Sequence, residues 1–500
     1  MRSNWGLGFD HGEQTRPVLR VLLIYSPNCA TLRLGSPKHQ GAAGKETGKL
    51  NGRWNESRRG GAPRSRGRSG LLRVSALSAA LLVAAACSDS KSDEVPALDG
   101  NKYVQTNLAA NNAEYKAQFT FPDLVNAWGL ADRPKGAGGH FWVGAGGKSF
   151  QFVGDVTKSS DEQVQKLFQD GLKLVTIPGA DADTSDNSVG KTTGVVFNPA
   201  PITSDLFVVH DQPVEAEGGP LNGSARFIFA TDSGKISAWT EQGFEGRIVR
   251  HDGPANLVFD GQPQGMQFFG IALTPSGDKL LAADFGADPQ VRTFDKNWQL
   301  IPTAGFANPF ATGDAIDPAT PEKGKKAKPG DPAPFNVSTI GNRVFVAYAT
   351  TQPDEADATK FDAGEEDSLD ADQEKAASGK PDKGKLAEFD AEGKLVRIID
   401  DGNRLNAPWA VTVAPEGFGP LSGKLLVGNF GGAGHVLAYD DATGKFTDYL
   451  RDADGKPVAI EGLWALMFGN GESLGDADSL YFTAGPDDEK DGLFGKLRLK

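Results

Sequence analysis

The stretch "NAPWAVTVAPEGFGPLSGKLLVGNFGGAGHVLAYDDATGKFTDYLR", residues 406–451, decides the fold. It contains four short segments, "PWAVTVAP", "KLLVGNF", "HVLAYD" and "FTDYL", and Gly, Asp or Pro residues close each of them. Short apolar or alternating runs between such turn residues are typical of β-strands joined by tight turns. We therefore predict a unit of four consecutive strands.

The same order of strands and turns recurs along the chain. The opening phrase returns as "NAWGLA" at 126–131 and more weakly as "GIALTP" and "GLWALM". Further units begin near residues 127, 191, 270, 335 and 462. The unit at 191–251 holds one predicted strand more than the pattern needs, so its boundaries stay open. Repetition at this spacing indicates a propeller-like array.

The two ends of the repeated region complement each other. The last unit has three predicted strands, and "KYVQTNL" at 102–108 stands alone before the first unit. If the N-terminal strand completes the last unit, both open sheet edges are protected. We predict an all-β fold, a six-bladed β-propeller whose ring is closed by this strand. A pair of β-sandwiches would explain neither the four-stranded units nor the complementary ends.

A segment that resembles a targeting signal precedes the repeats. In residues 64–86, arginines come before an apolar run that is too short to span a bilayer comfortably, as in a secretory signal peptide. Small residues and then Cys87 follow, which resembles a bacterial lipoprotein signal, and this resemblance implies lipidation of Cys87. The alternative is an ordinary signal-peptidase cleavage after Ala86 that leaves Cys87 unmodified.

These signals divide the chain into four parts. Residues 1–63 are expected to be an over-extended gene start or a disordered N-terminus, and 64–86 the signal peptide. Residues 87–101 form a polar, flexible tether, and 102–499 form the propeller. We expect an exported monomer in the periplasm or at the cell surface, held at the membrane through a lipid on Cys87 only.

The charge is distributed unevenly. Residues 1–86 carry 14 Lys and Arg against 4 Asp and Glu, which is a net charge of +10. Because the whole chain has a net charge of −13, residues 87–500 have a net charge of −23. An acidic body of this size repels phosphate backbones, and nucleic acid is therefore not an expected partner. The propeller region contains no cysteine, which excludes a disulfide framework or a cysteine-based metal site there.

Several segments carry a family resemblance. "YVQTNL", "LVNAWGLA", "ARFIFATDSGKISAW", "GLWALMFGNG" and "LYFTAGPDDEKDGLFGKL" resemble an uncharacterised family of secreted bacterial propellers, some with PEP-CTERM sorting tails. This family resembles the wider NHL, YWTD and SMP-30/gluconolactonase group of six-bladed propellers. The resemblance implies the fold but no activity, because the narrower family has no established one.

In a propeller, the loops entering the innermost strands and those leaving the second strands surround one mouth of the central channel. Six oxygen-bearing side chains occupy such positions: Asn126, Asp284, Asn336, Asn406, Asn429 and Glu461. Oxygen-rich sites of this kind suit Ca²⁺, and SMP-30-type relatives hold a catalytic divalent ion in this place, although their motif residues do not map cleanly here. The alternative is that these side chains cap their own turns.

Trp128, Trp409 and Trp464 fall at the same position of three units. A large ring at a repeated position is typical of packing between blades, and the alternative is an aromatic platform for a ligand. The carboxylate-rich insertion at 353–374 contains few large apolar residues and is predicted to be a solvated, mobile loop. The stretch "DADTSDN" at 181–187 resembles a calcium loop but has Thr192 where the motif needs Glu.

The pattern GxSxG occurs once, as "GESLG" at 471–475, but it lies between two predicted strands and not at the strand-to-helix turn that a nucleophile elbow requires. Two function hypotheses remain open. The first is a binding or interaction module at the cell envelope that recognises a protein or a glycan. The second is a Ca²⁺-dependent hydrolase or lactonase of the SMP-30/gluconolactonase kind, with its site at the channel mouth. The absence of a catalytic signature favours the first.

Overall fold

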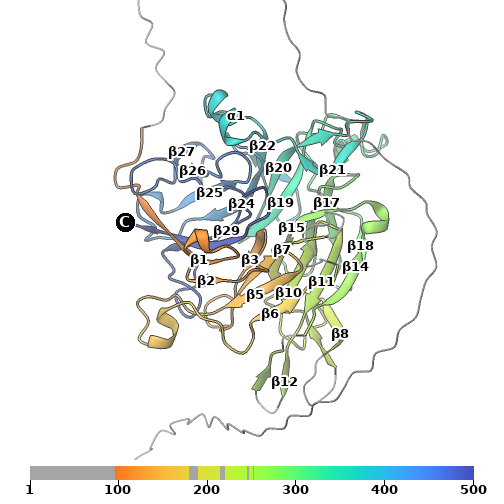
Figure 1. Cartoon of the computed structure of the whole chain (residues 1–500). Helices are drawn as coiled ribbons and strands as arrows, with labels where there is room; N and C mark the ends of the chain where they lie inside the picture. Colours follow the sequence, from red (N-terminus) through yellow and green to blue (C-terminus); the bar gives the residue numbers. More distant parts are fainter. Residues whose placement is uncertain (1–95, 180–189, 214–219, 245–246, 252) are drawn as a thin grey trace, which may run out of the picture. The chain divides into compact units, whose positions relative to one another are not determined.

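The computed structural model describes residues 96–179, 190–213, 220–244, 247–251 and 253–500. Six small antiparallel sheets form a ring, the six-bladed β-propeller that the repeats predict (Figure 1). The signal-like segment, Cys87 and the calcium-loop-like stretch all lie outside the described residues. No helix in the described part of the chain is long and apolar enough to cross a membrane.

Within a blade, the strands follow one another from the channel outward. The first blade contains β3 (Ala127–Ala131), β4 (Phe141–Ala145), β5 (Lys148–Phe152) and β6 (Leu174–Thr176). The second contains β7 (Thr192–Phe197), β10 (Phe227–Thr231), β11 (Lys235–Trp239) and β14 (Asn256–Asp260). The third contains β15 (Phe268–Leu273), β16 (Leu280–Asp284), β17 (Gln290–Phe294) and β18 (Leu300–Ile301). The chain thus builds each sheet from local hairpins.

The last three blades repeat the scheme. The fourth blade contains β19 (Pro332–Ile340), β20 (Arg343–Pro353), β22 (Gly384–Phe389) and β23 (Leu395–Ile398). The fifth contains β24 (Pro408–Val413), β25 (Lys424–Asn429), β26 (Val436–Asp440) and β27 (Phe446–Tyr449). The sixth contains β28 (Leu463–Phe468), β29 (Ser479–Ala484), β30 (Leu493–Leu499) and β1 (Tyr103–Ala110). The innermost strands of neighbouring blades contact one another around the whole ring.

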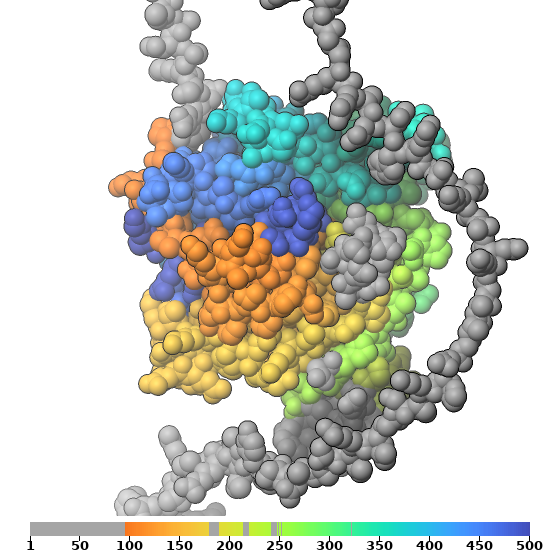
Figure 2. Space-filling model, viewed as in Figure 1, coloured from red at the N-terminus to blue at the C-terminus, as the bar shows by residue number. Residues whose placement is uncertain are grey.

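The ring closes as the sequence predicts. Strand β1 pairs antiparallel with β30, from Tyr103 opposite Leu499 to Ala110 opposite Leu493. The short strand β2 (Phe119–Thr120) extends this sheet on the outside of β1. In Figures 1 and 2 the orange N-terminal segment of the propeller therefore lies against the blue C-terminal one.

Glycines in the inner strands explain why one short phrase recurs. Near the axis the inner strands of adjacent blades approach closely. A Cβ atom on Gly129 would lie 2.3 Å from the backbone oxygen of Thr193, and one on Gly270 would lie 1.8 Å from the side-chain oxygen of Asn336. Contacts this short exclude a side chain, so a small residue follows the bulky one in the repeated phrase.

The second blade explains the extra strand at 191–251. Strand β8 (Val208–Gln212) pairs with β9 (Leu221–Ser224) in a hairpin apart from the blade sheet, and β12 (Gln242–Phe244) pairs likewise with β13 (Arg247–Val249). The outermost strand of the blade is β14, which lies beyond residue 251.

The insertion in the fourth blade differs from its prediction as a solvated, mobile loop. It contains β21 (Phe361–Glu366), which pairs with β20, and helix α1 (Ala371–Ala376). The helix begins at Asp370 with a complete capping box, in which the Asp370 side chain accepts from the backbone N–H of Gln373. Local hydrogen bonds therefore organise a segment that has few large apolar residues.

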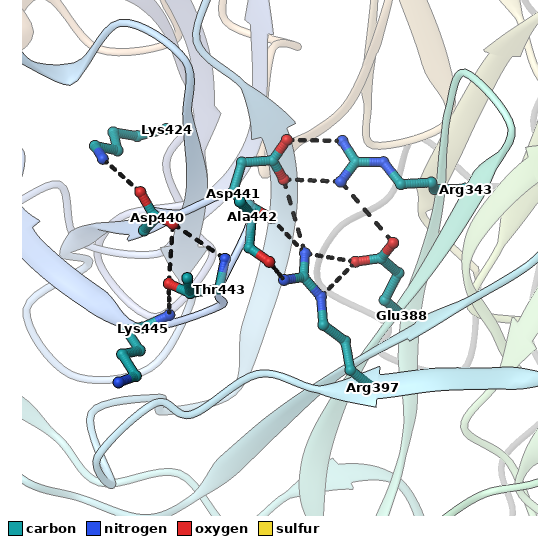
Figure 3. A network of polar contacts seen from close by, with 9 residues as sticks. All are labelled: Arg343, Glu388, Arg397, Lys424, Asp440, Asp441, Ala442, Thr443 and Lys445. Carbon is teal, nitrogen blue, oxygen red and sulfur yellow. Dashed lines mark hydrogen bonds and ion pairs between the residues drawn. The ribbon is translucent and has the colours of Figure 1, made fainter.

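A network of charged residues joins the fourth and fifth blades at their outer rim (Figure 3). Arg343 donates to both carboxylate oxygens of Asp441, at 2.8 and 3.1 Å. Arg397 pairs with Glu388 of its own blade and also donates to the backbone oxygens of Asp441 and Ala442 across the gap. Paired guanidinium and carboxylate groups of this geometry fix the angle between two neighbouring sheets.

Candidate functional site

Aromatic side chains close the central channel. Trp128 and Trp464 stack with their ring centroids 3.6 Å apart, and Phe430 stacks on Trp464 at 3.9 Å. Trp409 meets Trp464 edge to face at 6.1 Å, and Phe269 meets Trp128 at 5.3 Å. We call these five residues the aromatic plug. The three repeated tryptophans thus pack against one another across the channel axis.

A cavity with a volume of about 1420 Å³ lies on one side of the plug, and all six blades contribute to its wall. Trp128, Trp464, Phe269 and Phe430 form its apolar floor. A smaller cavity of about 430 Å³ is lined by later residues of the same inner strands, such as Leu130 two positions after Trp128. The plug therefore separates a large cavity from a small one.

The wall of the large cavity is rich in carboxylates. The acidic residues that line it are Asp232, Glu365, Glu366, Asp370, Asp372, Glu461, Asp488 and Glu489. Among the described residues that line it, Lys191 is the only basic one, and its Nζ lies 3.1 Å from Glu489 Oε2. The cavity is therefore strongly negative.

Glu489 is the centre of this acidic wall. Its charge acts on three other carboxylates, Asp232 of the second blade and Glu365 and Glu366 of β21. Burial together with this repulsion raises the pKa of Glu366 to about 8, and it raises that of Asp232 to about 6 although Lys191 acts in the opposite direction. Carboxylates that are crowded in this way are stabilised by a positive charge placed among them.

Asn126 connects the acidic wall with the aromatic floor. Its side-chain N–H donates to Glu489 at 2.7 Å, and its side-chain oxygen accepts from the indole N–H of Trp464 at 2.7 Å. Three consecutive residues of the adjoining loop, Asp487, Asp488 and Glu489, have φ values of 56°, 54° and 62°. Non-glycine residues adopt this conformation rarely, and it is more frequent at binding sites.

Asn406 and Asn429 lie beside the cavity but bind backbone. The side-chain N–H of Asn406 donates to the backbone oxygen of Leu369 at 2.7 Å, and its side-chain oxygen accepts from the backbone N–H of Leu369 at 3.0 Å. Leu369 belongs to the insertion and lines the cavity, so Asn406 anchors the insertion as part of the cavity wall. Asn429 donates to the backbone oxygen of Arg404 at 3.0 Å.

The remaining predicted site residues are also engaged locally. Asp284 accepts from two backbone N–H groups near its turn and pairs with Arg292 at 2.8 Å. Asn336 donates to the backbone oxygen of Trp409. Glu461 lines the cavity and accepts from the backbone N–H of Asp487 at 3.2 Å.

The six oxygen-bearing residues therefore do not point at a common centre. Four of them, Asp284, Asn336, Asn406 and Asn429, bind backbone groups, Asn126 binds the side chains of Glu489 and Trp464, and Glu461 alone of the six lines the cavity. Among the residues that the structure describes, no three His, Cys, Asp or Glu side chains are placed to share a metal ion.

Sequence reasoning missed Asp232, Lys191 and the carboxylates of β21. Asp232 follows the second strand of its blade as Asp284 does, so the same positional rule finds it once the blade boundaries at 191–251 are known. Glu365 and Glu366 had no comparable signal, because the insertion carries no repeat. The pairing of β21 with β20, the bond from Gly364 N–H to the Phe285 backbone oxygen and the contacts of Leu369 with Asn406 together bring them to the channel mouth.

No family model matches the chain. The chain is similar to uncharacterised protein R648 of Acanthamoeba polyphaga mimivirus, with 27% identity over 391 residues, which cover 78% of this chain and 79% of that protein. It is also similar to uncharacterised protein L690 of the same virus, with 26% identity over 44% of this chain and 49% of that protein. A third relative, R640, is 25% identical over 48% of this chain and 37% of its own length. These relatives are viral, whereas the sequence resemblance indicated a bacterial family, and none of them brings a known function.

Proposed function

We propose that this protein is a binding module whose ligand occupies the large cavity at the channel mouth. The observation that carries the proposal is the cavity itself, of about 1420 Å³, with an aromatic floor and with polar walls to which several blades contribute. Concave sites with an apolar base and a few converging polar groups are the usual form of a ligand site. The ligand would lie between the aromatic plug and helix α1.

The hydrolase alternative receives less support from the same geometry. A hydrolase needs a nucleophile or a metal-bound water beside a general base. The side chains nominated for a metal are occupied by backbone groups, as described above for Asn336, Asn406 and Asp284. We therefore favour binding without turnover.

A steric block of the cavity tests this proposal. Ala371 and Ala376 are both exposed residues of α1, and Ala371 lines the cavity whereas Ala376 does not. We expect Ala371→Trp to weaken binding of a cavity ligand at least about tenfold, which is 1.4 kcal/mol, and Ala376→Trp to leave it unchanged.

The measurement is thermal unfolding of the full chain with a panel of short peptides, oligosaccharides and lactones of different charge, followed by calorimetry of the compounds that raise the melting temperature. Equal affinity in the two variants would place the ligand elsewhere. Conversion of a lactone or ester to product, with or without Ca²⁺, would favour the hydrolase.

We also propose that the protein acts at a cell envelope, exported and anchored through Cys87, as a member of the secreted propeller family that the sequence resembles. The support is the order of arginines, apolar run and small residues before Cys87. The partner would then be a protein or glycan of the envelope.

Lipidation is tested by expression in a bacterial host with radiolabelled palmitate. We expect label in the membrane fraction for the natural chain and no label for Cys87→Ser, since the thiol is the acceptor. Cys29→Ser is the matched control and should keep the label. A natural chain that is exported but unlabelled would instead support ordinary cleavage after Ala86.

A further inference from the structure

The negative charge of the acidic residues in the large cavity exceeds the single positive charge of Lys191. Eight acidic residues line it, and Lys191 is the only basic one among the described lining residues. The ammonium of Lys191 is already 3.1 Å from Glu489. Glu365 and Glu461 are exposed to the solvent-filled space, and a cation that enters the cavity would meet their carboxylates directly.

The floor of the cavity supplies a second, independent observation. Trp128 lines the cavity and is 2% exposed, and its indole Nε1 finds no hydrogen-bond acceptor among the described residues. The equivalent groups are satisfied, because Trp464 donates to Asn126 and Trp409 to the backbone oxygen of Phe269. The Nε1 atom of Trp128 itself has less than 1 Å² of accessible surface, so the floor meets a ligand with ring carbons and not with this N–H.

These two features specify complementary parts of one ligand. The carboxylate wall requires a positive charge, and aromatic rings favour an ammonium or guanidinium group over an anion. The volume exceeds that of most small-molecule sites, which are roughly 300–1,000 Å³, so a segment of several residues fits.

We propose that the cavity recognises a cationic peptide segment, with Lys or Arg side chains among the carboxylates and above the aromatic floor. This inference rests on the proposed function, because it assigns the ligand class of the same cavity. The crowding of Glu366 and Asp232 around Glu489 agrees with it, since a bound cation relieves their mutual repulsion.

The test uses tri-lysine as the probe and calorimetry of the purified full chain. The variant Glu365→Gln/Glu461→Gln removes two exposed charges from the wall and keeps the size of both side chains. Its matched control is Glu392→Gln/Glu416→Gln, which removes two exposed charges outside the cavity, so both variants have the same net charge. Comparing them separates the cavity from general attraction by an acidic surface.

We expect tri-lysine to bind the natural chain and the control alike, and the wall variant to bind at least tenfold more weakly. Tri-lysine with acetylated side chains should not bind, and spermidine, which has the same charge but fills less of the cavity, should bind more weakly than tri-lysine. Equal weakening in both double variants, or tight binding of the acetylated peptide, would overturn the proposal. Equal affinity for spermidine would overturn its peptide part.

The Ala371→Trp variant distinguishes this proposal from the proposed function. If it blocks a neutral compound while tri-lysine fails to bind, the cavity is a binding site but not one for cations. If tri-lysine binds and neither Ala371→Trp nor the wall variant weakens it, tri-lysine binds outside the cavity and this proposal fails, while the proposed function is decided by the other compounds of the panel.

Discussion

A chain that begins at residue 111 is expected to lose its cooperative fold or to melt on the order of 10 °C lower than one that begins at residue 96. Both chains lack the leader, and they differ in the presence of β1. This strand supplies the outer partner of β30 and buries Tyr103, Leu108, Ala109 and Ala110. Burial of a side chain of the size of Tyr103 or Leu108 contributes about 1.5–3 kcal/mol each, which is large against a total stability of about 5–15 kcal/mol.

The measurement is thermal unfolding followed by circular dichroism. A synthetic peptide of residues 96–120 is expected to raise the melting temperature of the shortened chain, because it returns the missing strand in trans. A peptide of the same composition in scrambled order is the control. Equal melting temperatures for the two chains would show that the last blade is stable with three strands, and would refute the closure as a source of stability.

Trp464→Ala is expected to lower the free energy of unfolding by about 3–5 kcal/mol, the range observed when a buried Trp is replaced by Ala. Trp464 is 1% exposed and lies between Trp128 and Phe430, with ring centroids at 3.6 and 3.9 Å. Its removal leaves a void at the centre of the ring and joins the two channel cavities. Urea unfolding of both proteins gives the difference.

Trp464→Phe separates packing from hydrogen bonding. Phe keeps most of the stacking but loses the N–H that donates to Asn126, so we expect a loss of about 1 kcal/mol for the missing bond and a smaller void term. If Trp464→Ala costs less than about 1 kcal/mol, the plug does not hold the blades together. The repeated tryptophans would then be better explained by ligand contact than by packing.

The architecture was predictable because it rests on local patterns. Residues 406–451 place their turns and apolar runs as four strands, and the structure confirms these as β24 to β27. The lone strand at 102–108 and the incomplete last unit predicted the closure, which the pairing of β1 with β30 confirms. A strand in a propeller pairs mainly with its neighbour in sequence, so its pattern carries most of the information about its place.

The candidate site was less predictable. The rule that side chains around the inner strands meet at one mouth nominated Glu461, which lines the cavity, but also Asp284, which binds backbone near its own turn, and Asn336, which binds backbone of the next blade. The type of a residue and its place in a repeat do not fix the direction of its side chain. That direction follows from which buried N–H or C=O group otherwise lacks a partner.

Sequence alone was sufficient for the number of blades, the order of strands and the identity of the closing strand, because hairpin pairing and edge protection are local or depend on the two chain ends. The tertiary structure decided that Glu365, Glu366, Asp232 and Glu489 share one cavity above an aromatic floor. These residues come from three blades, and no repeat position marks Glu365 and Glu366 as members of the group. Their proximity to the others results from ring closure, from the pairing of β21 with β20 and from the hydrogen bonds by which Asn406 holds the insertion at the channel mouth.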